Sequence, residues 1–296
     1  MNPLRGAWHR TEAVAAQAVV SLAASAPLGA VLGVARLAAL VAYLVWWRRR
    51  RIAAENIRLA GVRVNKAQAR ALARASFTAF ATMVAESIVA RRRLTRDNWQ
   101  KYVSLHLSEE AEALLRRPGQ GLIVASAHLG NWEVAARAIS MIKPLLVAYR
   151  PFNNPHLNEV ARDARQGEHL RFVSRLEAHP MVFMRALADG AIVALMIDQH
   201  ATRGRIAIQF FDRPAWATKS VAMLSLTTRM PLLVAFAVRT GRMHYEIHAS
   251  GPIAYAHTGD REKDAAAITQ AITAEVEKAV RRHPEQYLWG HRRWRR

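Results

Sequence analysis

The sequence predicts an α/β fold: a mostly parallel sheet flanked by helices, preceded by a helical N-terminal membrane anchor. Two observations predict it. From residue 119 onward, short apolar runs alternate with helical patterns, and this alternation is typical of a parallel sheet. Before that point lies a long apolar stretch that ends in a cluster of arginines. With 296 residues, 52% of them hydrophobic, the chain is long enough to bury a substantial core.

The apolar stretch covers residues 13–47 and contains a single charged residue, Arg36. It closes with the letters YLVWW, and four arginines follow, which is the pattern of an aromatic belt beside a cytoplasmic flank. The stretch is longer than the ~20 residues of one span, and Pro27 and Gly29 interrupt it. Two membrane arrangements remain: one tilted span ending at Trp47, or a kinked helical hairpin lying in one leaflet.

Two other interpretations compete with the anchor. A buried, alanine-rich core helix has a similar composition, whereas a cleaved signal peptide fits poorly because the run is long and lacks a clear cleavage site. We therefore predict an anchor with its basic flank over residues 1–51 and a second domain over residues 52–296. This domain divides into a helical lead-in, 52–118, and an α/β core, 119–296. Either membrane arrangement places it at a cytoplasmic membrane surface.

The elements of the domain each have a local signal. Residues 52–90 are rich in alanine and helical in pattern, and Ser108 is suited to cap a short helix over 108–117 with acids in its first turn. The predicted core strands cover residues 122–127, 144–149, 170–174, 191–197 and 205–211. The predicted core helices cover residues 131–142, 154–166, 177–189, 218–229 and 260–283. Residues 231–250 predict a hairpin that turns at Thr240 and Gly241.

The chain is strongly basic, with a net charge of +21, and only six of its 43 basic residues are lysine. The excess of arginine and alanine is equally compatible with a GC-rich genome. Whatever its origin, this charge attracts anionic partners, such as phosphate-bearing lipids, acidic carrier proteins or nucleic acid. The charge alone does not choose among them.

The stretch AHLGNWE places His128 five residues before Glu133. Positions i and i+5 of a helix lie ~140° apart, so the two side chains meet only if His128 precedes the helix. We expect His128 at the carboxyl end of strand 122–127 and Gly130 in a sharp turn. Glu133 then falls in the first turn of the next helix, where it can fold back towards the imidazole.

Two other predicted strands end in residues that suit the same site. Arg150 directly follows one of them, and Asp198 and Gln199 follow another. Ligands of open α/β sheets bind at the carboxyl ends of the strands, so these side chains are expected to reach the rim that carries His128. The alternative is that they are polar strand-end residues that contact solvent.

These residue types favour acid–base chemistry. A histidine held by a carboxylate is a general base near neutral pH, and a nearby arginine holds a phosphate or a developing oxyanion. Ser126 is not spaced as a Ser–His pair, His200 and the other histidines lack metal-ligand spacing, and there is no cysteine. Nucleophile-elbow, phosphate-loop and dinucleotide motifs are missing as well. We therefore expect a bound hydroxyl to attack an activated acyl group directly, with no metal and no cofactor.

At these residues the sequence resembles the bacterial lipid A late acyltransferases, the lauroyl/myristoyl transferases of the lysophospholipid acyltransferase-like superfamily. The resemblance covers nearly the whole chain. AHLGNWE matches the family's H-x4-[DE] motif, YRPFNNP resembles the segment after its second strand, and MIDQH its Asp-Gln segment. FFDRPAWAT and PEQYLWGHRRWRR resemble later segments. The chain departs from the family at Asp212, at residues 200–202 and at Gly290, which bears on the acceptor more than on the reaction.

The resemblance implies a glycerolipid acyltransferase-like fold at the inner membrane, facing the cytoplasm. An acyl chain would move from a thioester on acyl carrier protein, or on coenzyme A, to a hydroxyl of a lipid A precursor. In that mechanism His128 is the general base and Glu133 orients its imidazole. The positions carried over as substrate-binding are Asn131, Arg150, Asp198 and Gln199. Acyl carrier protein is acidic and the acceptor glycolipid is phosphorylated, so the basic surface suits both.

Two rival functions remain. An acyltransferase for another glycolipid, such as a phosphatidylinositol mannoside, has the same fold, but those relatives often carry Asp where this chain has Glu133. A non-catalytic, membrane-bound protein that binds nucleic acid would explain the Arg and Trp residues of HRRWRR, which suit a membrane interface equally well. It leaves the convergence at the rim unexplained, so we expect no nucleic-acid partner.

Overall fold

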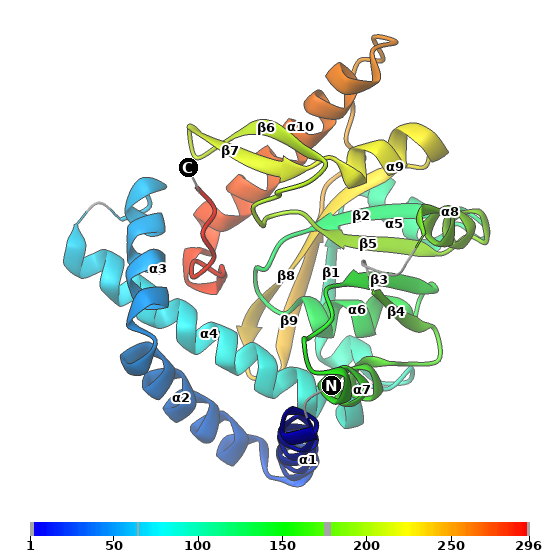
Figure 1. The fold of residues 1–296 in the computed structure, drawn as a ribbon. Helices are drawn as coiled ribbons and strands as arrows, with labels where there is room; N and C mark the ends of the chain where they lie inside the picture. Colours follow the sequence, from blue (N-terminus) through cyan, green and yellow to red (C-terminus); the bar gives the residue numbers. More distant parts are fainter. Residues whose placement is uncertain (1–2, 64, 175–178, 295–296) are drawn as a thin grey trace.

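The computed structural model describes residues 3–63, 65–174 and 179–294. Seven strands form one sheet in the order β1-β9-β8-β2-β5-β3-β4 (Figure 1). Five neighbouring strands, from β8 to β4, run parallel, and only the β8–β9 pair is antiparallel. The prediction of a mostly parallel sheet is confirmed. The strands are β1 (Val103–Leu107), β2 (Leu122–Ser126), β3 (Leu145–Tyr149), β4 (Leu170–Ser174), β5 (Ile192–Met196), β8 (Leu232–Gly241) and β9 (His244–Ala249).

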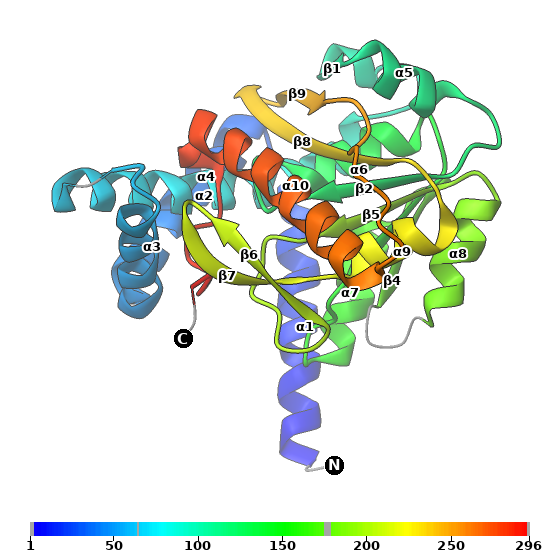
Figure 2. The same cartoon turned by 90° about the horizontal axis from the view of Figure 1, so that it is seen from above.

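Successive strand residues face two separate apolar layers, which explains why the strands read as continuous apolar runs. Leu122 packs with the layer that contains α5 (Glu109–Arg116) and α6 (Trp132–Ser140). Its neighbour Ile123 packs with the opposite layer, formed by α8 (Pro180–Ala188), α9 (Ser220–Thr228) and α10 (Arg261–Arg282). Figure 2 shows α9 and α10 together on that side of the sheet. Ile268, Ile272, Val276 and Val280, which share one face of α10, are buried there.

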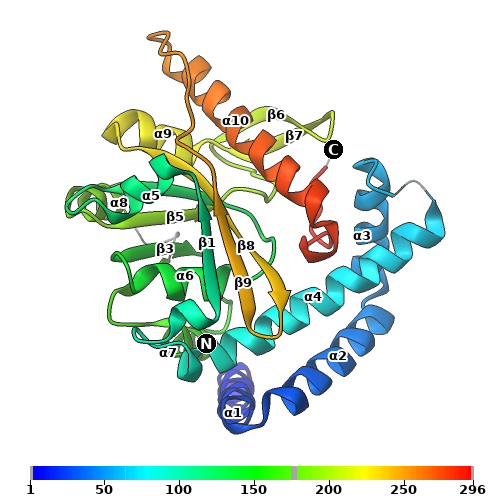
Figure 3. The ribbon, with the colours of Figure 1, turned by 180° about the vertical axis from the view of Figure 1, so that it is seen from behind.

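The N-terminal part contains three helices, α1 (Pro3–Ser25), α2 (Leu28–Val45) and α3 (Trp47–Leu59). The chain breaks at Pro27, as the sequence suggested, and again at Trp46, where ψ is 57°. The run 13–47 is therefore not one continuous helix, and whether α2 forms a tilted span stays a prediction. A hairpin is not formed either: α1 packs against α7 (Pro155–Arg165), and α2 lies along α4 (Lys66–Arg93) (Figures 1 and 3).

Two helices in the described parts of the chain, α2 and α4, are long and apolar enough to cross a membrane. Core helices of soluble proteins meet the same test, and α4 packs against α2, α3 and α6. α2 differs from α4 in the side chains that it exposes. Its outer face carries large apolar residues, including Val34, Leu37, Val41 and Leu44. The predicted boundary between residues 51 and 52 falls inside α3, and the division into two domains stays a prediction.

Several element predictions need correction. The helix expected over 52–90 is two helices, because Gly61 turns the chain with φ +66° and Asn65 caps α4. The lead-in is not wholly helical, since it contains the edge strand β1. The strand at 205–211 is β6 (Arg205–Phe210), which pairs with an unpredicted strand, β7 (Arg213–Thr218), outside the main sheet. The β8–β9 turn lies at Arg242 and Met243, and residues 177–178 of one predicted helix lie outside the described residues.

Candidate active site

Three strand ends meet at one rim of the sheet. Strand β5 lies between β2 and β3 and runs parallel to both, so the carboxyl ends of all three strands point the same way (Figure 1). His128 follows β2, Asp198 follows β5 and Arg150 follows β3. The rim expected from the sequence is therefore present, and it lies where ligands of open α/β sheets bind.

Gly130 makes the turn that carries His128. Its φ is +64°, and a Cβ added there would lie 1.8 Å from the carbonyl oxygen of Ala237, so no other residue fits without a shift of the backbone. The amide of Gly130 donates to the carbonyl of Gln286, at 3.0 Å, and that of Asn131 donates to Ala237, at 2.9 Å. The turn is thus held between β8 and the 3₁₀ helix η2 (Pro284–Gln286).

Asp198 holds His128 through two hydrogen bonds. The Nδ1–H of the ring donates to Oδ1 at 2.8 Å, and the main-chain N–H of His128 donates to Oδ2 at 3.1 Å. Only 4% of the Asp198 side chain is exposed, against 18% of the histidine. Because the carboxylate accepts at Nδ1, the neutral ring keeps its lone pair on Nε2. Trp132 packs edge-to-face on the imidazole, with the ring centroids 4.9 Å apart.

The contact between His128 and Asp198 shifts the pKa values of both side chains so that the charged form of each is favoured. Burial by itself lowers the pKa of His128 and raises that of Asp198, because it disfavours charge. The attraction between the two groups outweighs this, so the pKa of His128 lies above its usual value and that of Asp198 lies below. Glu133 adds a smaller upward contribution to the pKa of His128. The imidazole is therefore a stronger base than a free histidine.

Glu133 lies in the first turn of α6, as predicted, but it does not contact the imidazole. Its carboxylate pairs with Arg165 at the end of α7, at 2.9 Å. In this structure Nδ1 of the imidazole bonds to Asp198 rather than to Glu133, and the role of Glu133 in orienting the ring stays a prediction. Strand β5 is hydrogen-bonded beside β2, so the carboxylate of Asp198 reaches Nδ1, and Trp132 covers the ring on the α6 side.

The other predicted residues differ in their contacts. Asn131 is 1% exposed; its amide oxygen caps α6 and its Nδ2 donates to the hydroxyl of Tyr245. Those contacts belong to the protein's own framework. The main-chain carbonyl of Gln199 accepts from Arg293, and Arg150 is exposed at the rim. The roles of Asn131, Arg150 and Gln199 in substrate binding stay predictions.

The segment after α10 returns to this centre, which the sequence did not predict. The amide of Leu288 donates to the carbonyl of His128 at 3.0 Å. Arg293 is 3% exposed and donates to the carbonyl of Trp216 at 2.6 Å, and its charge helps to lower the pKa of Asp198. Burial, and then the carboxylate of Asp198, raise the pKa of Tyr287 well above its usual value. PEQYLWGHRRWRR resembles a family segment in sequence, but nothing in it indicates a contact with Asp198.

Comparisons with known proteins give the family of the chain. The sequence model of the family described as "Bacterial lipid A biosynthesis acyltransferase" matches residues 13–296. The chain belongs to this family.

Individual relatives of this lipid A acyltransferase family match at modest identity. The chain is 24% identical to the lipid A biosynthesis lauroyltransferase of Escherichia coli (strain K12) over 255 residues, 84% of this chain and 79% of that protein. It is 30% identical to the lipid A biosynthesis palmitoleoyltransferase of the same strain over 182 residues, 60% of this chain. The second match spans 56% of that relative, little more than half its length.

In this member of the lipid A acyltransferase family, a buried carboxylate lies behind the turn at Gly130. Glu86 of α4 is fully buried and accepts two hydrogen bonds from Arg239, both at 2.9 Å, and one from the amide of Met243 at 3.1 Å. It also accepts from the hydroxyl of Tyr245, which in turn accepts from Asn131. Burial, and then Glu86, raise the pKa of Tyr245, so this hydroxyl stays protonated. Glu86 thereby connects α4 and the β8–β9 hairpin to the cap of α6.

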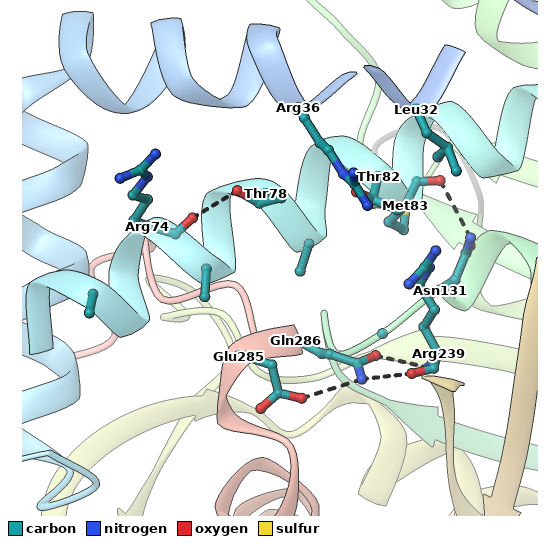
Figure 4. A pocket seen from close by; sticks show the side chains of 14 residues that line it. Leu32, Arg36, Arg74, Thr78, Thr82, Met83, Asn131, Arg239, Glu285 and Gln286 are labelled. Atoms are coloured by element: carbon teal, nitrogen blue, oxygen red, sulfur yellow. Dashed lines mark hydrogen bonds between the residues drawn. The ribbon is translucent and has the colours of Figure 1, made fainter. Parts of the chain in front are cut away.

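A cavity of about 550 Å³ lies next to the turn, between α2, α4 and η2 (Figure 4). Gly130 and Gln286 line both this cavity and a much smaller pocket that contains His128 and Trp132. The larger space is of the size that small-molecule sites have. Within the described parts of the chain, no cluster of three or more histidine, aspartate or glutamate residues is arranged to hold a metal ion.

Proposed function

We propose that this chain is a membrane-associated O-acyltransferase. It moves a fatty acyl chain from a thioester, on acyl carrier protein or coenzyme A, to a hydroxyl of a lipid A precursor. The observation that carries the proposal is the contact between His128 and Asp198 at the sheet rim, in a chain whose family is that of lipid A acyltransferases. The relatives named as lauroyl- and palmitoleoyltransferases support the reaction class.

His128 is the general base. Its Nε2 takes the proton of the acceptor hydroxyl while the oxygen attacks the thioester carbonyl, which gives a tetrahedral intermediate. As the C–S bond breaks, the imidazolium returns the proton to the departing sulfur, and a new C–O ester bond remains. Asp198 holds Nδ1–H, fixes the tautomer and stabilises the imidazolium that forms in between.

Glu133 and Arg150 have supporting roles in this mechanism. Glu133 acts at a distance, since its charge raises the pKa of His128 while its contact is with Arg165. Arg150 is exposed at the end of β3 and holds either a phosphate of the substrates or the charge of the intermediate.

The surface supports a location on the inner membrane with the active domain facing the cytoplasm. Exposed apolar side chains lie on α2 and at its end: Val34, Leu37, Val41, Leu44, Trp46 and Trp47. Arginines 48–51 follow at once in α3, where they meet anionic head groups on the cytoplasmic side. We propose that α1 and α2 lie against one leaflet, because they diverge at Pro27 and α2 is bound to α4.

The test is acyl transfer by the purified protein in mixed micelles that contain a lipid A precursor, with acyl carrier protein and coenzyme A thioesters offered separately. Mass spectrometry of the product gives the chain length and the acylated position. We expect His128→Ala to lower kcat roughly 10²–10⁴-fold. His106→Ala, on the edge strand β1, is the matched control and is expected to keep full activity. Full activity of His128→Ala refutes the mechanism, and transfer only to another glycolipid refutes the acceptor.

A further inference from the structure

Arg36 is the one charged residue of the apolar stretch 13–47, and the structure gives its position a reason. It lies one helical turn after Leu32, which is buried against α4, and both line the 550 Å³ cavity. The large exposed apolar side chains of α2, such as Val34 and Val41, lie on the other side of the helix. Figure 4 shows the Arg36 side chain extending from α2 towards α4. The charge therefore faces the cavity, where water and ligands reach it.

The cavity combines an apolar wall with free positive charge. Its α4 side includes the apolar residues Ala71, Ala75, Ala79 and Met83, and Arg74 lies among them. Across the described residues, Arg36 and Arg74 form no salt bridge, whereas the third arginine of the lining, Arg239, is neutralised by Glu86. Two unpaired guanidinium groups next to an apolar wall match an amphiphilic anion, because one guanidinium group can bind two phosphate oxygens at once.

A carboxylate and two hydroxyls refine the choice of ligand. Glu285 lines the same cavity, and so do Thr78 and Thr82. A carboxylate in the lining repels a plain anion but accepts hydrogen bonds from hydroxyl groups. A ligand that bears both a phosphate and free hydroxyls satisfies all of these groups, as the head group of a phosphorylated sugar lipid does.

We propose that this cavity binds the phosphorylated sugar head group of the acceptor lipid, with Arg36 and Arg74 on its phosphate groups and Glu285 on sugar hydroxyls. The inference rests on the proposed function and adds the residues that select its acceptor. The cavity shares Gly130 and Gln286 with the pocket of His128, so a head group held there lies next to the reacting centre. It opens beside α2, whose apolar outer face is the one that meets the membrane in our proposal.

Kinetics with two acceptors test this inference. The acceptor KM and kcat are measured for Arg36→Gln and Arg74→Gln with the phosphorylated glycolipid and with the same lipid after dephosphorylation. We expect each substitution to raise the KM for the phosphorylated acceptor about tenfold or more, with kcat and the donor KM nearly unchanged. With the dephosphorylated acceptor, the variants and the wild-type protein are expected to be alike.

Arg70→Gln is the matched control. Arg70 is exposed on the same helix, one turn before Arg74, and is not part of the cavity lining. An unchanged acceptor KM in both cavity variants overturns the inference. So does a loss that is equally large for both acceptors, or one that falls on the donor KM.

A binding arm separates this inference from the reaction itself. Wild-type protein without donor is mixed with vesicles that contain the phosphorylated glycolipid or its dephosphorylated form, and co-sedimentation is measured. Preferential binding that Arg36→Gln and Arg74→Gln abolish supports the site even if no acyl transfer occurs, which would refute the proposed function alone. Equal binding to both vesicles overturns the inference. Competition by equimolar inorganic phosphate also overturns it, because the site would then recognise free phosphate.

Discussion

The reaction centre and the cavity lined by Arg36 and Arg74 share Gly130 and Gln286, yet they are built in different ways. In the centre, each polar group is held by a neighbour: His128 by Asp198, the turn by Ala237 and η2. In the cavity, Arg36 and Arg74 are exposed and carry their charge unpaired among the described residues.

This difference indicates that the reaction rate depends on the centre and the choice of acceptor on the cavity. A general base works only at a fixed distance and in one tautomer, so its neighbours are buried and rigid. A head-group site tolerates side chains that order themselves when the ligand arrives, at an entropic cost that binding repays. We therefore expect substitutions in the centre to change kcat and substitutions in the cavity to change KM.

Asp198→Asn is expected to have the largest effect. The amide does not stabilise the imidazolium, and its NH₂ group opposes Nδ1–H, so kcat should fall roughly 10²–10⁴-fold. Glu133→Gln, which leaves the contact with Nδ1 intact, should lose far less. Steady-state kinetics of both variants decide the matter. If Glu133→Gln is the more damaging of the two, the carboxylate predicted from the sequence is the true partner during the reaction.

Glu86→Ala removes the carboxylate that connects both regions to α4. Loss of one member of a buried ion pair costs roughly 3–5 kcal/mol, and about 3 kcal/mol is expected here because the side chain of Arg239 is 28% exposed. Urea unfolding measures this free energy. Glu55→Ala, on the exposed surface of α3, is the control and should change it by less than about 0.5 kcal/mol. Equal stability of the two variants would show that the network does not hold the turn.

Gly130→Ala changes a residue that lines both the reaction centre and the cavity. Its matched control is Gly61→Ala, since Gly61 has nearly the same φ, +66°, but open space around the added methyl group. The control should lose about 1–2 kcal/mol of unfolding free energy from backbone strain alone. Gly130→Ala should lose more, because of the clash with Ala237, and should worsen both kcat and the acceptor KM. A variant that changes only one of the two kinetic constants would show that the regions are independent.

The pH dependence of activity is a smaller effect that sharpens the same comparison. The base must be unprotonated, so kcat/KM falls at acidic pH with an apparent pKa above the ordinary 6.5 of histidine. Glu133→Gln removes a charge that raises the pKa of His128, so it should move the acidic limb of the pH profile to lower pH. Arg36→Gln should leave the limb in place. An unmoved limb in Glu133→Gln would show that its charge does not reach the imidazole.

Stability should follow pH in a related way. The folded pKa of His128 is raised, so its stabilising contribution is complete below the unfolded value, 6.5, and is lost as pH rises through the folded value. The folded pKa of Asp198 is lowered, so its contribution is present above the unfolded value, 3.8, and is lost as pH falls through the folded one. The pair thus stabilises the fold most between these two unfolded values. Tm against pH should show a smaller gain in that window for His128→Ala than for the wild-type protein.

The rim was predictable because short apolar runs fix the parallel strands and the residues after them. Which carboxylate holds His128 was not. Both Glu133 and Asp198 reach the rim, and the choice depends on β5 pairing directly with β2, a sheet order that no local pattern encodes. The turn at Gly130 followed from the spacing, and its closeness to Ala237 did not.

Other elements were missed for related reasons. β1 is a short edge strand in which polar and apolar residues mix. The second residue of β7 is a proline, which argues against a strand. The cavity arises only when α2 packs along α4, so Arg36 read as an isolated charge in an apolar run. The residues from Tyr287 to Arg293 act through contacts with segments more than 70 positions earlier in the chain.

The position of those last residues in the chain has a consequence for biosynthesis. Residues emerge from the ribosome in order, and N-terminal parts fold first. The apolar helices α1 and α2 are therefore available to the membrane long before Leu288 and Arg293 exist to close around His128 and Asp198. Under the proposed function, the protein reaches its site of action before its reaction centre is complete. The nascent chain then lies at the lipid surface while it is still unable to use acyl thioesters.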